Sequence, residues 1–406
     1  MNCLSPKIFV ENAGPDEVKL NDEIKWSENG MKTLEISVQP LTPILTGGAN
    51  RTTDRLHETG IIGSLRWWYE AIVRGIGGSA CDPTKTKCRY DEVLCDVCQV
   101  FGATGWKRRF DMRIVRDETG PAWTGTDLRI IPPGRSHGWF LPAGRVGKFT
   151  LKIRGDSEIV GILASLLLFL EKRGAMGAKP QLGYGFFKIV NRSEVSKCAK
   201  KWEIMGSNNE RPDVPDLRHW FFFKFRFKPS HPDWWMRIGG LQRLLGNRKD
   251  ASVVSHLAEL GMVPVSPVLK NRWRFVEWDA PFPAKRWLFG SSTGEDRLRS
   301  RVSVSWAYRE GGVWVVRGWA SIPEEERTKS GVFQHRQDID LLEKTPKTIC
   351  PHHQPPFQHR QDIDLLEKML NDETIWKKAL NLDYTTPTDL NVDRLTDKDI
   401  IRFMEG

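Results

Sequence analysis

The sequence has no long hydrophobic run and no recognisable secretion signal. Its longest apolar stretch, Ile159 to Leu170, is much shorter than the roughly 20 residues that a helix needs to cross a bilayer. The N-terminal segment carries Glu11, Asp16 and Glu17 and lacks the order of basic and then apolar residues that marks a signal peptide. We therefore expect a cytoplasmic protein that has no membrane partner.

The sequence also lacks the residue patterns of common catalytic sites. It contains no evident Ser/His/Asp set, suggestive carboxylate pair, HD motif or metal-nuclease motif. The glycine-rich segment from Gly174 to Gly185 has neither the Walker ending nor the spacing of a dinucleotide fingerprint. The residue patterns therefore give no evidence for an enzyme, and we assign no catalytic residue.

His57 is the residue that keeps an enzymatic alternative open. It lies in a polar stretch with Arg51, Asp54 and Arg55 nearby, where an imidazole that titrates near neutral pH could transfer a proton. A phosphate contact or a surface hydrogen bond is the simpler role for this side chain, and we favour it.

The chain does have a basic centre and many aromatic rings. Its 406 residues include 61 basic and 51 acidic side chains, and the acidic excess is confined to residues 1–30 and 321–406. A basic body favours a polyanionic partner. The 17 tryptophans and 19 phenylalanines, several of them beside Arg or Lys, suit single-stranded nucleic acid, whose bases stack on rings. Alternatively, the protein is an ordinary basic one whose rings form its core.

Hydrophobic periodicity predicts an α+β fold of tandem ferredoxin-like (RRM-like) domains. Residues 31–190 follow the order strand, helix, strand, strand, helix, strand. A cysteine-bearing insertion at about residues 76–105 interrupts this first domain. A linker at residues 191–218 leads to a second ferredoxin-like domain at residues 219–325, whose helices are less clearly marked.

The two ends of the chain are assigned to additional segments. Residues 1–30 are predicted to be an N-terminal extension, and residues 326–406 a helical C-terminal region. The segment FQHRQDIDLLEK occurs twice in this region, at residues 333–344 and 357–368. Because old repeats diverge, an unchanged copy indicates a recent duplication or a cloning artefact rather than a solenoid. We assign it no function.

Four cysteines lie close together in the insertion: Cys81, Cys88, Cys95 and Cys98. Cys95 and Cys98 form a CxxC pair, which is half of many zinc sites, and four thiolates would complete the coordination of a structural zinc ion. The spacing between Cys81 and Cys88 is wider than usual for zinc. Two disulfides, or neither a metal nor a disulfide, remain as alternatives.

Four motifs in a fixed order resemble those of the RAMP superfamily of CRISPR proteins. They are PLTPILTGG, GSLRWWYEAIVRG, CDVCQVFGATGWKRRF and RGAMGAKPQLGYG, within residues 33–190. More closely, they look like the first subunit of the Cmr complex, the type III-B RNA-targeting effector. The resemblance implies a non-catalytic subunit that contacts guide RNA and target RNA near the 3′ region of the guide. Its other partners would be the remaining Cmr subunits, and its role would be antiviral defence.

The expected RNA-binding surface combines basic side chains, one tryptophan and the glycines of the loop after residue 173. These residues are Arg51, Arg55, Arg66, Trp67, Lys107, Arg108, Arg109, Lys172, Arg173, Gly174, Gly177, Lys179, Gly183 and Gly185. Two other functions remain open. One is a metal-independent endoribonuclease that processes CRISPR RNA, and the other is an assembly subunit that contacts only proteins.

Overall fold

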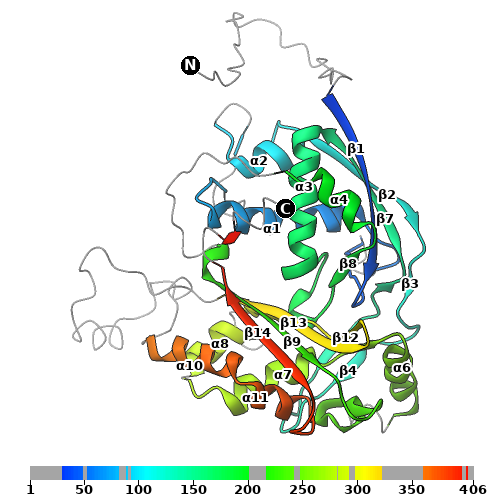
Figure 1. Ribbon diagram of the computed structural model, residues 1–406, viewed down its shortest axis with the longest axis vertical. Coiled ribbons are helices and arrows are strands. Elements are labelled where there is room, and N and C mark those ends of the chain that lie inside the picture. The colour runs from blue at the N-terminus through cyan, green and yellow to red at the C-terminus, as the bar shows by residue number, and fades with distance from the viewer. Residues whose placement is uncertain are drawn as a thin grey trace, which may run out of the picture.

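The computed structural model describes residues 30–48, 53–81, 88–89, 93–200, 216–241, 247–280, 282–291, 298–321, 360–395 and 399–400. Nearly all of the expected N-terminal extension, most of the linker and the first copy of the repeat lie outside these residues. The described chain is a mixture of helices and antiparallel sheets, with one large sheet in each half (Figure 1). None of its helices is both long and apolar enough to span a bilayer.

The first half is built on a four-stranded antiparallel sheet. Its strands, in spatial order, are β2 (Phe110–Asp117), β7 (Phe149–Asp156), β1 (Met31–Pro40) and β8 (Phe187–Ile189). Alternate residues of β1 are buried, including Ile36 and Val38, as the apolar and polar alternation of this segment predicts. Ile36 pairs with Leu151 of β7, so both strands present their apolar side chains to the same face.

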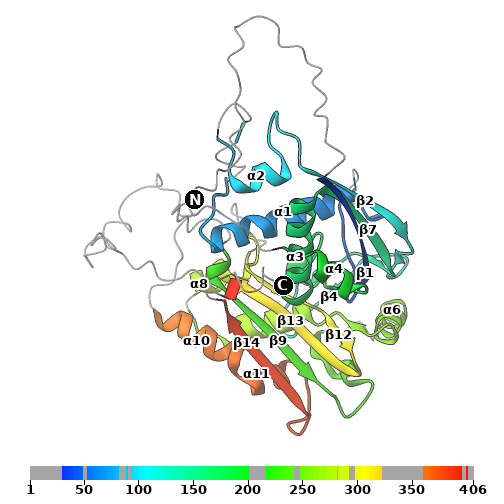
Figure 2. The same ribbon diagram turned by 45° about the horizontal axis from the view of Figure 1, so that its top comes forward.

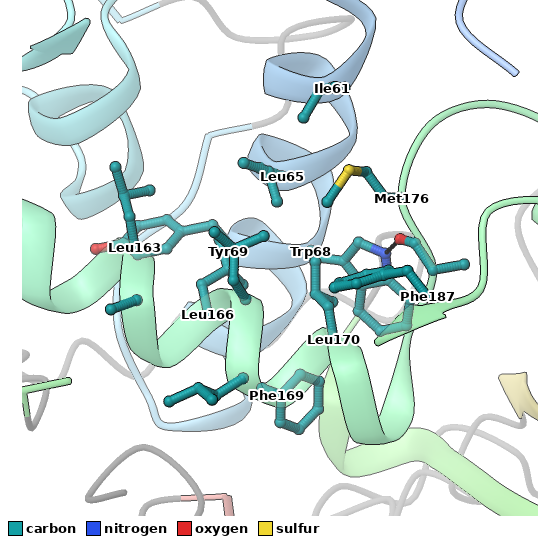
Figure 3. Packing of buried hydrophobic residues seen from close by; sticks show 14 of the residues in the cluster. Ile61, Leu65, Trp68, Tyr69, Leu163, Leu166, Phe169, Leu170, Met176 and Phe187 are labelled. Carbon is teal, nitrogen blue, oxygen red and sulfur yellow. Dashed lines mark hydrogen bonds between the residues drawn. The ribbon is translucent and has the colours of Figure 1, made fainter. Parts of the chain in front are cut away.

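Two long helices cover the apolar face of this sheet. Helix α1 (Glu58–Gly75) and helix α3 (Ser157–Arg173) pack together through rings and branched side chains, as Figure 3 shows. Trp68 of α1 is 1% exposed, and its Nε1 donates a hydrogen bond of 2.9 Å to the carbonyl oxygen of Ala175. Every residue of α3 from Ile159 to Leu170 is buried, because the second half of the protein packs on its other side.

The second half is built on a six-stranded sheet. Its strands are β10 (Met262–Val263), β12 (Ala307–Glu310), β13 (Val313–Ser321), β9 (Trp220–Phe227) and β14 (Thr388–Arg394), with β11 (Val302–Val304) paired to β13. Strand β9 is buried on both faces. Trp220 and Phe222 join the core around α1 and α3, whereas Phe221 and Phe223 join a second core. This double burial explains why β9 reads as a continuous aromatic run instead of an alternating one.

The remaining elements are shorter and lie between these strands or at the ends. They are α2 (Asp96–Phe101), β3 (Gly120–Pro121), β4 (Leu128–Ile130), β5 (Trp139–Leu141), β6 (Arg145–Val146), η2 (Pro180–Leu182), α4 (Arg192–Cys198), η3 (Leu217–His219), η4 (Trp234–Arg237), α6 (Arg248–Glu259), α7 (Ser266–Arg272), η5 (Trp273–Glu277), α8 (Phe282–Phe289), α10 (Arg360–Asn371) and α11 (Glu373–Ala379).

The C-terminal segment departs from the helical region predicted for residues 326–406. Helices α10 and α11 are present, but β14 follows them and pairs with β9 along its length, from Thr388 opposite Phe227 to Arg394 opposite Phe221 (Figure 2). Strand β14 lies at the edge of its sheet and is mostly only half-buried. Its hydrophobic pattern is therefore weak, which hid the strand in the sequence.

Candidate metal centre and candidate nucleic-acid interface

The four cysteines of the insertion converge. The Sγ atoms of Cys81, Cys88, Cys95 and Cys98 all lie within 4.8 Å of one another, and those of Cys81 and Cys98 are 3.5 Å apart. Four sulfurs arranged tetrahedrally at the usual Zn–S distance are about 3.8 Å apart. The spacing therefore suits a shared metal ion, and the wide Cys81–Cys88 gap in the sequence is no obstacle.

Local structure and nearby donors hold the cluster in place. Cys95 caps helix α2, and its Sγ accepts from the backbone N–H groups of Cys98 and Cys81 at 3.4 Å each. Arg66 of α1 donates to the Sγ of Cys98 at 3.3 Å and to the carbonyl oxygen of Gly102 at 2.8 Å. The donors to Cys95 favour its thiolate, the form of cysteine that binds metals, whereas the hydrogen bond with Cys95 and then burial raise the pKa of Cys98.

The pKa values within the cluster diverge because the thiols share protons. The hydrogen bond with Cys98, together with the backbone donors, lowers the pKa of Cys95 to about 4. Burial, reinforced by the charge on Cys95, raises the pKa of Cys81 to about 11. Once one thiolate forms, its charge resists ionisation of its neighbours, and a divalent cation would relieve that repulsion. The donor set thus fits a metal such as zinc.

A second cluster forms where the first loop of the chain meets the glycine-rich loop. The N–H of Ala178 donates to the carbonyl oxygen of Leu45 at 2.8 Å, and the N–H of Gly185 donates to that of Pro43 at 2.9 Å. Arg145 exchanges backbone hydrogen bonds with Ile44 on the other side of the first loop. The first and the last of the four sequence motifs are therefore side by side.

The glycines of this loop are required by packing. Gly177, Gly183 and Gly185 have φ values of +87°, +92° and +86°, a region that favours glycine. A Cβ atom on Gly177 would overlap the carbonyl oxygen of Leu45, and one on Gly183 would overlap the Trp306 ring. Gly174 faces Trp68 and Leu170. These contacts account for the glycines without an RNA ligand.

The expected basic finger after the cysteines is largely ion-paired. Arg109 lies 2.9 Å from Asp156, and Arg108 lies 3.6 Å from Asp111. Lys107 is exposed and forms no ion pair with the residues that the structure describes. Lys107 is therefore the member of the finger best able to meet a phosphate.

The other predicted basic residues are dispersed. Arg66 is committed to the cysteine cluster and to Glu70, at 3.1 Å. Arg55 is exposed and 3.7 Å from Glu58, while Lys179 is exposed at a φ of 57° in the glycine-rich loop. Arg51 lies outside the described residues. RNA binding by each of these side chains stays a prediction.

The cleft between the two large sheets collects another part of the predicted set. This cavity of about 610 Å³ is lined by the end of α3, by β8 and by the polar side chains of β9 and β14. Arg173 contacts Asp393 at 2.5 Å, and burial followed by the charge of Arg192 lowers the pKa of Lys172. Acidic groups line this cleft together with the bases, so it is a mixed surface.

Trp67 and His57 occupy separate places on α1. The Trp67 ring is 38% exposed and lies 5.3 Å from the ring of Trp68 and 5.4 Å from that of Trp220. One edge of Trp67 can therefore meet solvent or a ligand. His57 directly precedes α1, its side chain makes no capping hydrogen bond to the helix, and its Nε2 lies 2.8 Å from a carboxylate oxygen of Asp54.

Arg145 is a structurally important residue that the sequence did not point to. This side chain donates to the carbonyl oxygens of Thr119 at 2.5 Å and of Asp54 at 2.8 Å, joining the segment between β2 and β7 to the loop before α1. No motif surrounds Arg145 in the sequence. Only its position beside the first loop reveals that it fixes this surface.

One family model matches a segment in the first half of the chain. Residues 37–188 match the family model of the RAMP superfamily, so the resemblance drawn from the four motifs is confirmed over this segment. No curated protein matches the chain.

Solved structures that are similar to the chain include CRISPR effector subunits. The crystal structure of Cmr1 from Pyrococcus furiosus in its apo form shares 14% identity, with 74% of this chain and 92% of that chain covered and a TM-score of 0.31. A chain of the type III-B Cmr-beta complex bound to cognate target RNA and AMPPnP shares 12% identity, with coverages of 73% and 96% and a TM-score of 0.36. A chain of a type IV-B CRISPR complex shares 13% identity, with coverages of 44% and 95% and a TM-score of 0.26.

Proposed function

We propose that this chain, which contains a RAMP-superfamily segment at residues 37–188, is a non-catalytic RNA-binding subunit of a type III-B CRISPR effector complex. The family match carries the proposal. It covers the segment in which the first loop and the glycine-rich loop meet and from which Lys107 and Lys179 project. The proposed partners are guide RNA, target RNA and the other Cmr subunits.

Both large sheets have the strand order of a ferredoxin-like domain, which supports a tandem arrangement. In the first sheet the strands that are first, second, third and fourth in the chain are β1, β2, β7 and β8, and they lie in the order 4-1-3-2. In the second sheet β9, β12, β13 and β14 repeat that order. RNA-recognition modules share this topology.

Neutralising two exposed lysines should weaken RNA binding through lost phosphate contacts. Replacing both Lys107 and Lys179 with alanine should lower the affinity for single-stranded RNA. The slope of log K against log salt concentration should become less steep by up to about 1.4, because each phosphate contact contributes about 0.7 to it. The measurement is a filter-binding titration at several salt concentrations. Lys249→Ala on α6, which removes an exposed lysine elsewhere, should leave the slope unchanged.

The effect should be independent of RNA sequence, because phosphate contacts position a strand and do not read its bases. A double variant with the affinity and the salt slope of the unmodified protein would remove Lys107 and Lys179 from the interface. If the unmodified protein shows no binding to RNA at moderate salt, the assembly-only function is favoured instead.

We propose that His57 orients the loop before α1 and does not cleave RNA. Its Nε2 faces Asp54, and its backbone N–H donates to the Thr46 hydroxyl at 2.9 Å, which ties it to the first loop. Labelled single-stranded RNA should therefore stay intact during incubation with the purified protein, with or without a divalent metal. Cleavage that disappears in His57→Ala would establish the endoribonuclease alternative.

We further propose that the four cysteines hold a structural zinc ion. Cys81, Cys88, Cys95 and Cys98 would supply all four ligands and leave no open position for a substrate or a water molecule. The ion would then fix the insertion against α1 through Arg66 and would take no part in chemistry.

A further inference from the structure

A second cavity lies where the end of the glycine-rich loop meets the second half of the chain. Its volume is about 450 Å³, within the range of small-ligand sites. Gln181 and Leu182 of the loop form one wall, and α7 with the following residues forms another. The charged, polar and aromatic side chains that line it include Arg135, Phe140, Lys270, Asn271, Arg274 and Arg299.

The charge of this cavity is of one sign among the lining residues that the structure describes. Lys270, Arg274 and Arg299 line it without an ion pair to any aspartate or glutamate that the structure describes, in contrast to the mixed cleft between the sheets. Clustered cations without carboxylates nearby are costly to fold, because each disfavours the charge on the next. Such an arrangement is expected where an anion supplies the missing charge.

Burial and repulsion between neighbouring cations lower the pKa values of Arg274 and Lys270 in the wall of the cavity. Burial, followed by the charges of Arg135 and Arg286, lowers the pKa of Arg274. Burial and then the charge of Arg274 lower the pKa of Lys270 to about 7. Lys270 Nζ is held by the carbonyl oxygen of Gln181 at 2.5 Å, and Arg274 donates to that of Gly290 at 2.8 Å. Neutral carbonyl groups position these cations but do not neutralise them.

Two buried polar atoms in the wall have no hydrogen-bond partner among the described residues. One is Oδ1 of Asn271, a residue that is 6% exposed, and the other is Nε of Arg274. Buried polar groups in proteins nearly always have a partner. Both residues line the cavity, so this wall carries polar groups that the described part of the protein leaves unpaired.

An exposed ring stands at the same cavity. Phe140 is 57% exposed, and the Arg129 guanidinium lies 5.5 Å from its centroid. Phe275 is also partly exposed, but Arg135 and Arg274 already lie 4.4 and 4.9 Å from its centroid. Phe140 is the more exposed of the two rings and has one guanidinium near it instead of two, so it is the better surface on which a flat, uncharged ring can stack.

We propose that this cavity binds a phosphorylated nucleoside, with the phosphate held by Arg274 and Arg299 and the base stacked on Phe140. The ligand is either one nucleotide of a bound RNA strand or a free nucleotide. The first source rests on the proposed RNA-binding function, whereas the second does not.

Calorimetric titration of the full chain with adenosine 5′-monophosphate and with inorganic phosphate tests the site. The nucleotide should bind at one site per chain, about tenfold more tightly than phosphate. Arg299→Ala should weaken both ligands about tenfold, the factor that corresponds to 1.4 kcal/mol of binding free energy. Phe140→Ala should weaken the nucleotide alone. Both side chains are exposed, so the variants should fold.

Arg248→Ala on α6 is the matched control, because it removes an exposed arginine outside the cavity and should change neither affinity. Absence of nucleotide binding, equal affinity for phosphate and nucleotide, or unchanged binding in Arg299→Ala or Phe140→Ala would each overturn the proposal.

Displacement distinguishes the two sources of the ligand and separates this inference from the proposed function. Single-stranded RNA that displaces the nucleotide identifies the site as one for a strand, and failure to displace it identifies a free nucleotide. RNA binding without nucleotide binding would refute the pocket and leave the proposed function standing. Nucleotide binding without any RNA binding would support the pocket and refute the proposed RNA-binding function.

Discussion

Removing the metal from the cysteine cluster should destabilise the first half of the protein by about 4 kcal/mol. A ligand present at about 1,000 times its Kd stabilises the folded state by that amount, provided that the unfolded chain does not bind it. Cys98 is the most informative position, because it is buried, lies 3.5 Å from Cys81 and accepts from Arg66. Cys98→Ser should therefore lower both the zinc content and the melting temperature.

The measurements are metal analysis of reduced protein and thermal unfolding with and without a chelator. The unmodified protein should contain about one zinc ion per chain and lose stability on chelation, whereas Cys98→Ser should be insensitive to the chelator. Cys198→Ser is the control, since Cys198 lies outside the cluster. A zinc content near zero in the unmodified, chelator-free protein would refute the metal site.

Replacing Gly185 with alanine should destabilise the protein by about 3 kcal/mol, the second large effect that we expect. The residue has a φ of +86°, where a side chain costs energy, and its Cβ would overlap the carbonyl oxygen of Met176. The backbone N–H of Met176 donates to the carbonyl oxygen of Gly185 at 2.8 Å, so neither segment can move away without losing a hydrogen bond. Urea unfolding would measure the loss.

Gly63→Ala provides the matched comparison. Gly63 lies on the exposed side of α1, and no atom lies within 4 Å of the position that its Cβ would take, so alanine should stabilise the helix by about 0.5–1 kcal/mol. The pair also tests why the loop is rich in glycine. Loss of RNA binding in Gly185→Ala with unchanged stability would show that the glycine serves close approach of RNA and not packing.

Local pattern sufficed for much of the first half of the chain. The alternation in β1 and the helical spacing of Leu65, Trp68 and Ile72 in α1 reflect burial on one face, which any single segment displays by itself. The acid before α3 and the bases at its end likewise marked its limits. The CxxC pair indicated a metal centre, and the structure brings all four thiols together.

Other features depend on partners that are distant in the sequence. Strand β14 exists because β9 offers it an edge, and Arg145 acquires its role from loops that meet it only after folding. The hydrogen bond from Arg66 to Cys98 and the ion pair of Arg109 with Asp156 could not be predicted from charge alone, because both depend on how the folded chain places the two partners. The basic cavity near Arg274 is assembled from segments that lie far apart in the chain.

The amino-acid sequence by itself determined the strand β1, the helices α1 and α3, the candidate cysteine cluster and the family resemblance, because these depend on periodicity and on short motifs. Only the tertiary structure decided which cations are exposed, which glycines are needed for packing and where the C-terminal strand lies. Those properties are set by long-range contacts. The identity of a charged residue or a glycine does not reveal whether its neighbour in the folded protein is solvent or another part of the chain.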